Sequence, residues 1–107
     1  MSIPVATIET QFQIPVTDNN GQQFPSADWE ALEERLLEFG GGTVLAEIDG
    51  WWRDGGQVYR ERSNRYLIDL ESWEDLPRWL ELVRWARERF GQIAIRIRVA
   101  GITDIIR

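Results

Sequence analysis

The chain has 107 residues, 43% of them apolar, and a net charge of −6. A chain of this length and apolar content is expected to form one domain, residues 1–107, whose core needs no disulfide or structural metal. The sequence contains no cysteine, no histidine and no lysine. This excludes disulfides, thiolate nucleophiles, thiolate and imidazole metal ligands and lysine Schiff bases, so we expect neither a metal nor a cofactor.

The charges are distributed unevenly along the chain. Residues 1–50 hold one arginine and nine acidic residues, whereas residues 51–107 hold eleven arginines and nine acidic residues. An acidic total disfavours binding to nucleic acids or to anionic membranes through overall charge. No apolar run is long enough to span a membrane, and the N-terminal segment lacks the basic and apolar regions of a secretion signal. The expected location is therefore the cytoplasm, with neither a membrane nor a nucleic acid as a partner.

The first part of the chain predicts a strand followed by a helix. Apolar and polar residues alternate over residues 4–16, as they do in a strand with one buried face. Turn-forming residues follow, and Ser26 or Asp28 is placed to cap a helix. The apolar residues of this helix recur at helical spacing until Gly40, which ends it.

The rest of the chain predicts two strands, a second helix and a last strand. Strand-like runs at residues 43–49 and 57–71 flank a glycine-bracketed loop, Gly-Trp-Trp-Arg-Asp-Gly-Gly, and form a long hairpin. Polar residues near positions 60–64 predict a bulge or an overhang in the second of these strands. Ser72 is expected to cap a helix over residues 73–90. Residues 92–99 alternate as a final strand, before a short apolar tail.

The order of these elements is β-α-β-β-α-β. Short connections and antiparallel pairing make the ferredoxin-like superfold the natural solution for this order. The predicted fold is α+β, with a four-stranded antiparallel sheet in the order 4-1-3-2 and both helices on one face.

The glycine- and tryptophan-rich hairpin carries a resemblance to known proteins. Its motifs are Phe-Gly-Gly at positions 39–41, Gly-Trp-Trp at 50–52 and Gly-Gln-Val-Tyr-Arg-Glu at 56–61, with Tyr66 further along the same strand. Over residues 39–70 the chain resembles uncharacterised small α+β proteins with a Gly-Trp hairpin. The resemblance implies a fold and assigns no activity.

The tryptophans outside the predicted core are candidates for a binding surface. Trp51 and Trp52 are adjacent, so they cannot both face the same side of a strand, and at least one must cover a neighbouring element or meet a partner. Arg53 follows them directly. Trp85 falls opposite the apolar stripe of its helix, where it can stack on a guanidinium or form a self-association interface.

The outward face of the predicted sheet carries charges of both signs. Glu61, Arg96 and Arg98 lie on this face, where they can form cross-strand pairs or contact a ligand. Arginines beside a carboxylate lower its pKa, whereas a general acid needs a raised pKa. This argues against an enzyme.

Three functional hypotheses follow. The main one is a non-enzymatic interaction module that forms a homodimer and binds a protein partner through its sheet face or its Trp hairpin. The alternative is a small cofactor-independent enzyme or ligand-binding protein, with a pocket between sheet and hairpin formed by Glu61, Tyr66 and an arginine. The third is an accessory protein of a phage or mobile element that binds a host protein.

Overall fold

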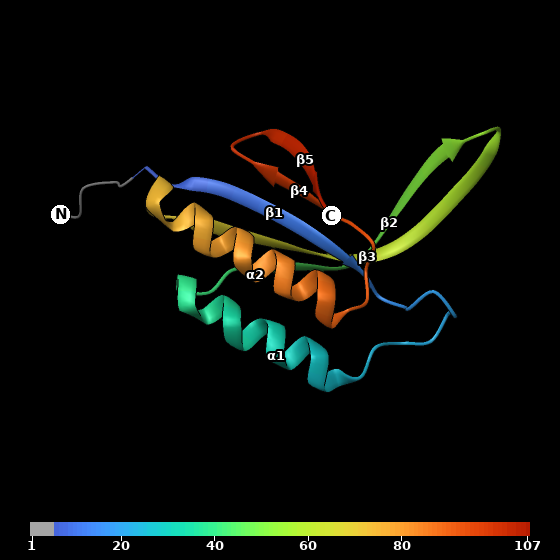
Figure 1. Cartoon of the computed structure of the whole chain (residues 1–107), viewed down its shortest axis with the longest axis horizontal. Helices are drawn as coiled ribbons and strands as arrows, with labels where there is room; N and C mark the ends of the chain where they lie inside the picture. The colour runs from blue at the N-terminus through green and yellow to red at the C-terminus, as the bar shows by residue number, and fades with distance from the viewer. Residues whose placement is uncertain (1–5) are drawn as a thin grey trace.

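The computed structural model describes residues 6–107, and these residues form one five-stranded antiparallel sheet and two α-helices (Figure 1). Both helices lie on the same side of the sheet, and the strand order is β2-β3-β1-β4-β5. Positions 4 and 5 of the predicted first strand lie outside the described residues. The elements in chain order are β1 (Ile8–Pro15), α1 (Ser26–Leu36), β2 (Thr43–Asp54), β3 (Gln57–Leu70), α2 (Leu76–Arg89), β4 (Ile95–Val99) and β5 (Ile102–Ile106).

The sheet has one strand more than predicted. Its first four strands have the predicted order, but the apolar tail pairs along β4 as β5, so the prediction of a four-stranded sheet is wrong. Ala100 and Gly101 both have positive φ, 49° and 82°. Positive φ at both central residues is what a two-residue hairpin turn of type I′ requires. The tail therefore turns back at once and becomes the edge of the sheet.

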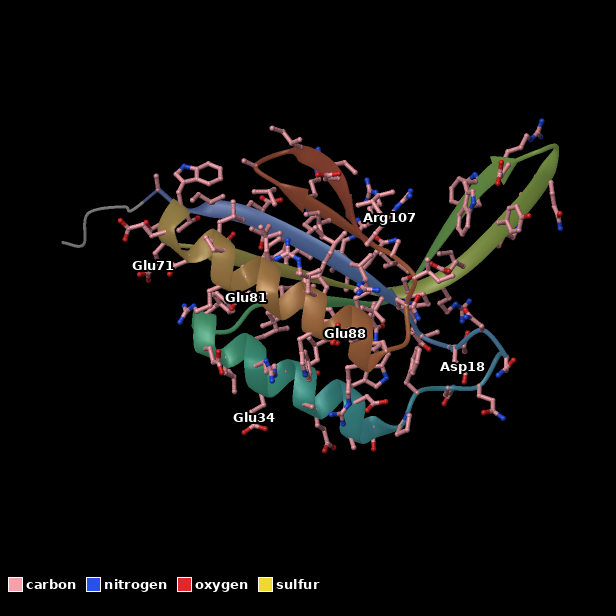
Figure 2. All side chains as sticks on the ribbon, viewed as in Figure 1. Asp18, Glu34, Glu71, Glu81, Glu88 and Arg107 are labelled. Carbon is pink, nitrogen blue, oxygen red and sulfur yellow. The ribbon has the colours of Figure 1, made fainter. Side chains whose placement is uncertain are left out.

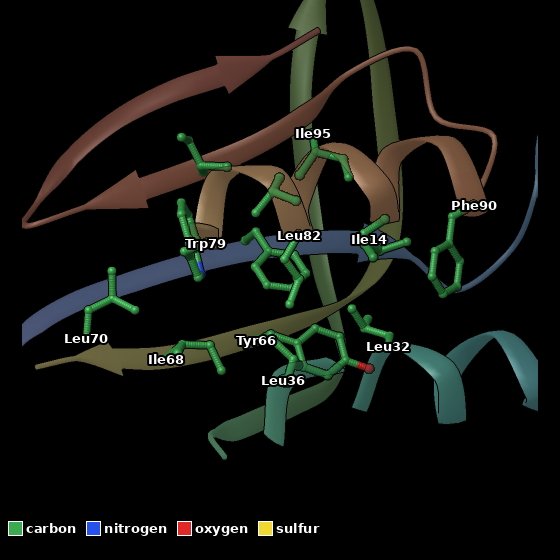
Figure 3. Packing of buried hydrophobic residues seen from close by; sticks show 14 residues of the cluster. Ile14, Leu32, Leu36, Tyr66, Ile68, Leu70, Trp79, Leu82, Phe90 and Ile95 are labelled. Atoms are coloured by element: carbon green, nitrogen blue, oxygen red, sulfur yellow. The ribbon is translucent and has the colours of Figure 1, made fainter. Parts of the chain in front are cut away.

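The core lies between the two helices and one face of the sheet (Figure 3). Strand residues enter it at alternate positions, as predicted, and Phe12 stacks on Tyr66 of the neighbouring strand with ring centroids 5.4 Å apart. Ile93 was predicted to belong to the last strand, but β4 begins only at Ile95 and the Ile93 side chain is 83% exposed. The buried apolar residues are Phe12, Ile14, Leu32, Leu36, Tyr66, Ile68, Leu70, Trp79, Leu82, Val83, Ala86, Phe90, Ile95 and Ile97.

Of the two predicted helix caps, the one at the first helix is absent and the one at Ser72 is present. Ser26 is the first residue of α1, and no side-chain hydrogen bond caps this helix. Asp28 instead accepts a hydrogen bond from Arg89 of α2 at 2.7 Å (Nε to Oδ1), which joins the two helices. Ser72 does act as a cap: its Oγ accepts the N–H of Glu74 at 3.1 Å, and a short 3-10 turn leads into α2. Neither of these helices has the length and apolar character that crossing a bilayer would require.

Strands β2 and β3 continue past the sheet as a two-stranded arm, residues 48–63 (Figure 1). The prediction that Trp51 and Trp52 lie in a loop is wrong, because β2 runs on through both residues and pairs with β3 to its end. Aromatic side chains favour a paired strand, since they pack against their cross-strand neighbours. The turn is formed by Gly55 and Gly56 alone, with φ of 58° and 80°.

A β-bulge separates the arm from the rest of the sheet. The register shifts between Leu45 and Ile48, so that two residues of β2 lie opposite Asn64 of β3. One of them, Glu47, has a φ of 51°, and its N–H donates to Oδ1 of Asn64 at 3.0 Å. Bulges bend a strand and increase its twist. The predicted overhang near residues 60–64 is present, but the bulge lies in β2 opposite Asn64 and not in β3 itself. The bulge explains why the arm departs from the plane of the sheet.

Candidate functional site

A cleft of about 670 Å³ opens between the arm and the β4–β5 hairpin. We call it the arm cleft. Its residues come from the sheet face that points away from the helices, and a volume of several hundred Å³ is typical of a site for a small molecule. Figure 2 shows side chains on both flanks of the arm and on the strands beside it. The polar side chains that line the cleft are Gln13, Asp49, Glu61, Ser63, Arg65, Gln92 and Arg96.

The strand register explains which side chains reach the cleft. In antiparallel strands, directly paired residues point to the same face. Glu61 is paired with Gly50, and Ser63 is paired with Ile48. Because Gly50 has no side chain, β2 leaves space beside the Glu61 carboxylate.

Two side chains of the cleft are already held by neighbours. Arg65 donates from Nε and Nη2 to Oε1 of Gln13, at 3.2 and 3.1 Å. Asp49 pairs with Arg62 at 3.1 Å (Oδ1 to Nε), and this hydrogen bond, together with the charge of Asp49, raises the pKa of the Arg62 guanidinium. Asp49 is thus compensated within the arm, although both partners are exposed and the pair adds little stability.

Glu61 and Arg96 carry charges that no opposite charge compensates. Ser63 Oγ donates to Glu61 Oε1 at 3.4 Å, and no basic side chain of residues 6–107 lies within ion-pair distance of this carboxylate. Within the same range, Arg96 has neither a hydrogen-bond partner nor an ion-pair partner for its side chain. The cleft therefore offers one carboxylate and one guanidinium to a ligand that carries both signs of charge.

The arm supplies an aromatic wall to the cleft. Trp52 and Tyr59 are cross-strand partners, and their rings stack with centroids 5.7 Å apart and planes inclined by 15°. The Trp52 side chain is 48% exposed. Trp51 is paired with Arg60, so its side chain leaves β2 on the opposite side from Trp52; it also borders the cleft and is 73% exposed. The predicted separation of the two indoles is confirmed, and the stacked pair keeps exposed ring surface for a planar ligand.

Four of the eight residues predicted as binding residues line the arm cleft: Trp51, Trp52, Glu61 and Arg96. Arg98 lies two positions further along β4 and borders a shallow depression next to the cleft. Arg53 is exposed on the arm opposite Val58 and does not line the cleft.

Tyr66 and Trp85 lie elsewhere. Tyr66 faces the helices and is only 4% exposed; this burial, with a smaller contribution from the charge of Glu33, raises the pKa of its hydroxyl to about 12. Side chains alternate along β3, so Tyr66 and Glu61 point to opposite faces, and the predicted pocket containing both does not form. Trp85 is half-buried against the core, and the guanidinium of Arg35 in α1 stacks over its ring at 4.1 Å. Its predicted exposure is wrong because α1 lies alongside it.

Gln13, Ser63 and Arg65 line the cleft but are not among the predicted binding residues, although alternation places Gln13 and Arg65 on the outward face of the predicted sheet. Ser63 and Arg65 share the odd-numbered face of β3 with Glu61, and Gln13 pairs directly with Arg65. The alternation of side chains along β3 predicts that Ser63 and Arg65 lie on the same face as Glu61, and strand pairing adds Gln13. No group of three or more acidic side chains in residues 6–107 is placed to hold a metal ion.

Solved structures of other proteins share this fold. A phage SAM lyase in complex with S-methyl-5′-thioadenosine aligns over 99% of this chain and 92% of its own, with a TM-score of 0.69 and 16% identity. A phage SAM lyase in the apo state aligns over the same fractions, with a TM-score of 0.65 and 20% identity. A divalent cation tolerance protein (Cut A1) from Thermus thermophilus aligns over 94% of this chain and 81% of its own, with a TM-score of 0.55 and 10% identity. No protein-family model and no curated protein matches the sequence.

These comparisons contradict the main functional hypothesis, a non-enzymatic module that self-associates and binds a protein partner. Two of the structures with this fold are of an enzyme, and they cover 99% of the chain. The comparisons agree better with the alternative hypothesis of a small enzyme or ligand-binding protein with a pocket beside the hairpin. None of these structures bears on the resemblance to Gly-Trp hairpin proteins, which stays a prediction.

Proposed function

We propose that the protein is a small enzyme that binds S-adenosylmethionine in the arm cleft and cleaves it to S-methyl-5′-thioadenosine. The observation that carries this proposal is that one cleft holds two uncompensated charges, Glu61 and Arg96, and the indole of Trp52, which Tyr59 supports by stacking. The likeness of the fold to phage SAM lyase supports the choice of ligand.

Each part of S-adenosylmethionine matches a feature of the cleft. The adenine ring is planar and can stack on the exposed surface of Trp52, as bases do on aromatic side chains. The carboxylate of the amino-acid part is suited to the guanidinium of Arg96, and the ammonium group to the carboxylate of Glu61. A ligand with one of these groups alone would leave part of the cleft unused.

The reaction needs little from the protein. The bond between the sulfur and the four-carbon amino-acid chain breaks, and its electron pair returns to the sulfur, which loses its positive charge. An oxygen of the substrate's own carboxylate forms the new bond to the carbon that the sulfur leaves. The products are S-methyl-5′-thioadenosine and homoserine lactone, with no water or proton consumed, so the absence of histidine, cysteine and lysine from the sequence is no obstacle.

The surroundings of the cleft suit this step. Attack of a carboxylate on a carbon bonded to a sulfonium neutralises two opposite charges, so it is favoured where separated charges are solvated less well than in water. Ile48 and Ile105 line the cleft together with the indoles and supply such surroundings. In this proposal Arg96 holds one carboxylate oxygen and leaves the other free to attack, while Glu61 fixes the ammonium group.

Incubation of the purified protein with S-adenosylmethionine, followed by chromatography and mass spectrometry, tests the proposal. We expect S-methyl-5′-thioadenosine and homoserine lactone in equal amounts, formed faster than in the protein-free control. Glu61→Gln should slow product formation by roughly tenfold or more, the effect of losing one charge-assisted hydrogen bond. Glu81→Gln, which removes an exposed carboxylate of α2, is the matched control and should leave the rate unchanged. Product formation at the protein-free rate would refute the lyase activity.

The predicted homodimer and the predicted cytoplasmic location do not enter this proposal. They stay predictions, and sedimentation of the purified protein measures the first of them.

A further inference from the structure

A second groove of about 470 Å³ lies between α1 and the first residues of β2. We call it the α1–β2 groove. It lies on the helix side of the sheet, whereas the arm cleft lies on the other side, and the two share no lining residue. Nothing in the proposed reaction uses this groove.

The hydroxyl of Tyr66 opens onto this groove without a partner. The Tyr66 side chain lines the groove although the residue is only 4% exposed. Figure 3 shows its ring in the core with the hydroxyl directed toward α1. Among residues 6–107 this hydroxyl forms no hydrogen bond. The buried side-chain atoms of residues 6–107 that lack a partner are Trp79 Nε1 and Arg87 Nε, so the Tyr66 oxygen is the accessible end of a buried side chain and is open to a ligand in the groove.

The rim of the groove is acidic. Glu30, Glu33 and Glu34 line it from α1, and no basic side chain of residues 6–107 forms an ion pair with any of them. Their spacing of three and four residues places like charges next to each other on one helix, which destabilises the helix. The nearest arginine in the sequence, Arg35, is stacked on Trp85. Figure 2 shows Glu34 on the outer side of α1, at the border with solvent.

The floor of the groove is apolar. Leu37 and Val44 line it and are both exposed. A methylene chain would cover these two side chains and remove their surface from water. The groove thus combines an apolar floor, an acidic rim and one unpaired phenol.

We propose that the α1–β2 groove binds an aliphatic polyamine. The methylene segments would lie on Leu37 and Val44, and the ammonium groups would pair with Glu30 and Glu33. Tyr66 would accept a hydrogen bond from one ammonium group. A tyrosine phenol is protonated at neutral pH, so its own O–H remains available to donate to a carboxylate of the rim.

Titration of the full-length protein with spermidine, followed by calorimetry, tests the proposal. We expect one molecule to bind per chain. Glu33→Gln should weaken binding by roughly tenfold, since it removes one charge-assisted hydrogen bond at an exposed position outside the core. Tyr66→Phe should weaken it several-fold while the buried ring keeps its place in the core, and a thermal melt checks that this variant is folded.

Two controls distinguish binding in the groove from general attraction of a cation to an acidic surface. Glu81→Gln changes the net charge by the same amount on α2, away from the groove, and should alter affinity by less than about twofold. Equal weakening by Glu81→Gln and Glu33→Gln, or unchanged binding to Tyr66→Phe, would overturn the proposal.

A short lysine peptide of the same charge should bind more weakly than spermidine. If it bound more tightly and kept the dependence on Tyr66, the occupant would be a basic protein segment and not a polyamine.

Discussion

Trp52 of β2 stacks on Tyr59 of β3 across the arm, with ring centroids 5.7 Å apart and planes inclined by 15°. The two rings are held by the strand pairing, which the turn at Gly55 and Gly56 closes. The stack therefore forms before any ligand arrives, and little side-chain entropy remains to be lost on binding.

Replacement of Trp52 tests the aromatic wall. Trp52→Ala is expected to weaken binding of S-adenosylmethionine between about fivefold and a hundredfold, because stacking of a base on an aromatic side chain contributes about 1–3 kcal/mol. Calorimetry or fluorescence titration measures the affinity. Trp73→Ala is the matched control, since Trp73 is 59% exposed and does not line the cleft. Equal affinities of wild type and Trp52→Ala would remove Trp52 from the site.

The bulge is expected to set the direction of the arm. Asn64→Ala removes the acceptor for the N–H of Glu47, which should lower the free energy of unfolding by about 1 kcal/mol. The loss should also weaken ligand binding, because the arm is aimed from this point. Asn64→Asp keeps the acceptor oxygen and should retain most of both properties. Denaturant unfolding and calorimetry measure the two effects, and an Asn64→Ala variant with unchanged affinity would show that the bulge does not position the cleft.

Gly42 is a site of close packing. A Cβ at this position would lie 2.6 Å from the backbone oxygen of Leu67 and would also clash with Cδ1 of Ile68. Gly42→Ala should therefore lower the free energy of unfolding by about 1–3 kcal/mol, the usual range for overpacking. Gly50→Ala is the control, because the nearest atom to its Cβ would be the Glu61 backbone oxygen at 3.9 Å, an ordinary contact. Similar stability of the two variants would contradict the packing seen at Gly42.

The buried hydroxyl of Tyr66 makes stability depend on pH in the alkaline range. The unfolded chain loses this proton near the ordinary pKa of 10.0, whereas the folded chain keeps it until about 12. The unfolded state thus binds fewer protons between these values, so the free energy of unfolding falls as pH rises through this window. We expect a loss of about 1–2 kcal/mol, less than the full shift implies, because the hydroxyl borders the α1–β2 groove. Denaturant unfolding at several pH values measures it, and Tyr66→Phe should abolish this part of the dependence. A Tyr66→Phe variant with the wild-type pH profile would refute the assignment.

Much of the fold could be predicted because local patterns and packing agree. Alternation of apolar and polar residues indicates β1, β3 and β4, and apolar residues at helical spacing indicate α1 and α2. The fifth strand was missed because its residues, Ile-Thr-Asp-Ile-Ile, do not alternate between apolar and polar. The length of β2 was missed because Gly50 was interpreted as a turn residue, whereas it lies in extended strand opposite Glu61.

The candidate site was harder to predict than the fold. Glu61 and Arg96 could be placed on the outward face by alternation alone. The cleft between them depends on the twist of the arm, which arises where Glu47 adopts a positive φ, and no residue type marks that position in advance. The bulge lies in β2, so the alternation of side chains along β3 is unbroken. This alternation alone predicts that Tyr66 and Glu61 point to opposite faces of the sheet.

Mapping of S-adenosylmethionine on the protein by nuclear magnetic resonance tests the central claim most directly. Isotope-labelled protein is titrated with the ligand, and the indole N–H and arginine side-chain resonances are followed. The account predicts that the largest shifts occur at Trp52 and Arg96, with smaller ones at Arg65, and that the indole of Trp73 is unaffected. Shifts confined to residues of the α1–β2 groove, or no shifts at saturating ligand, would contradict the assignment of the arm cleft as the site.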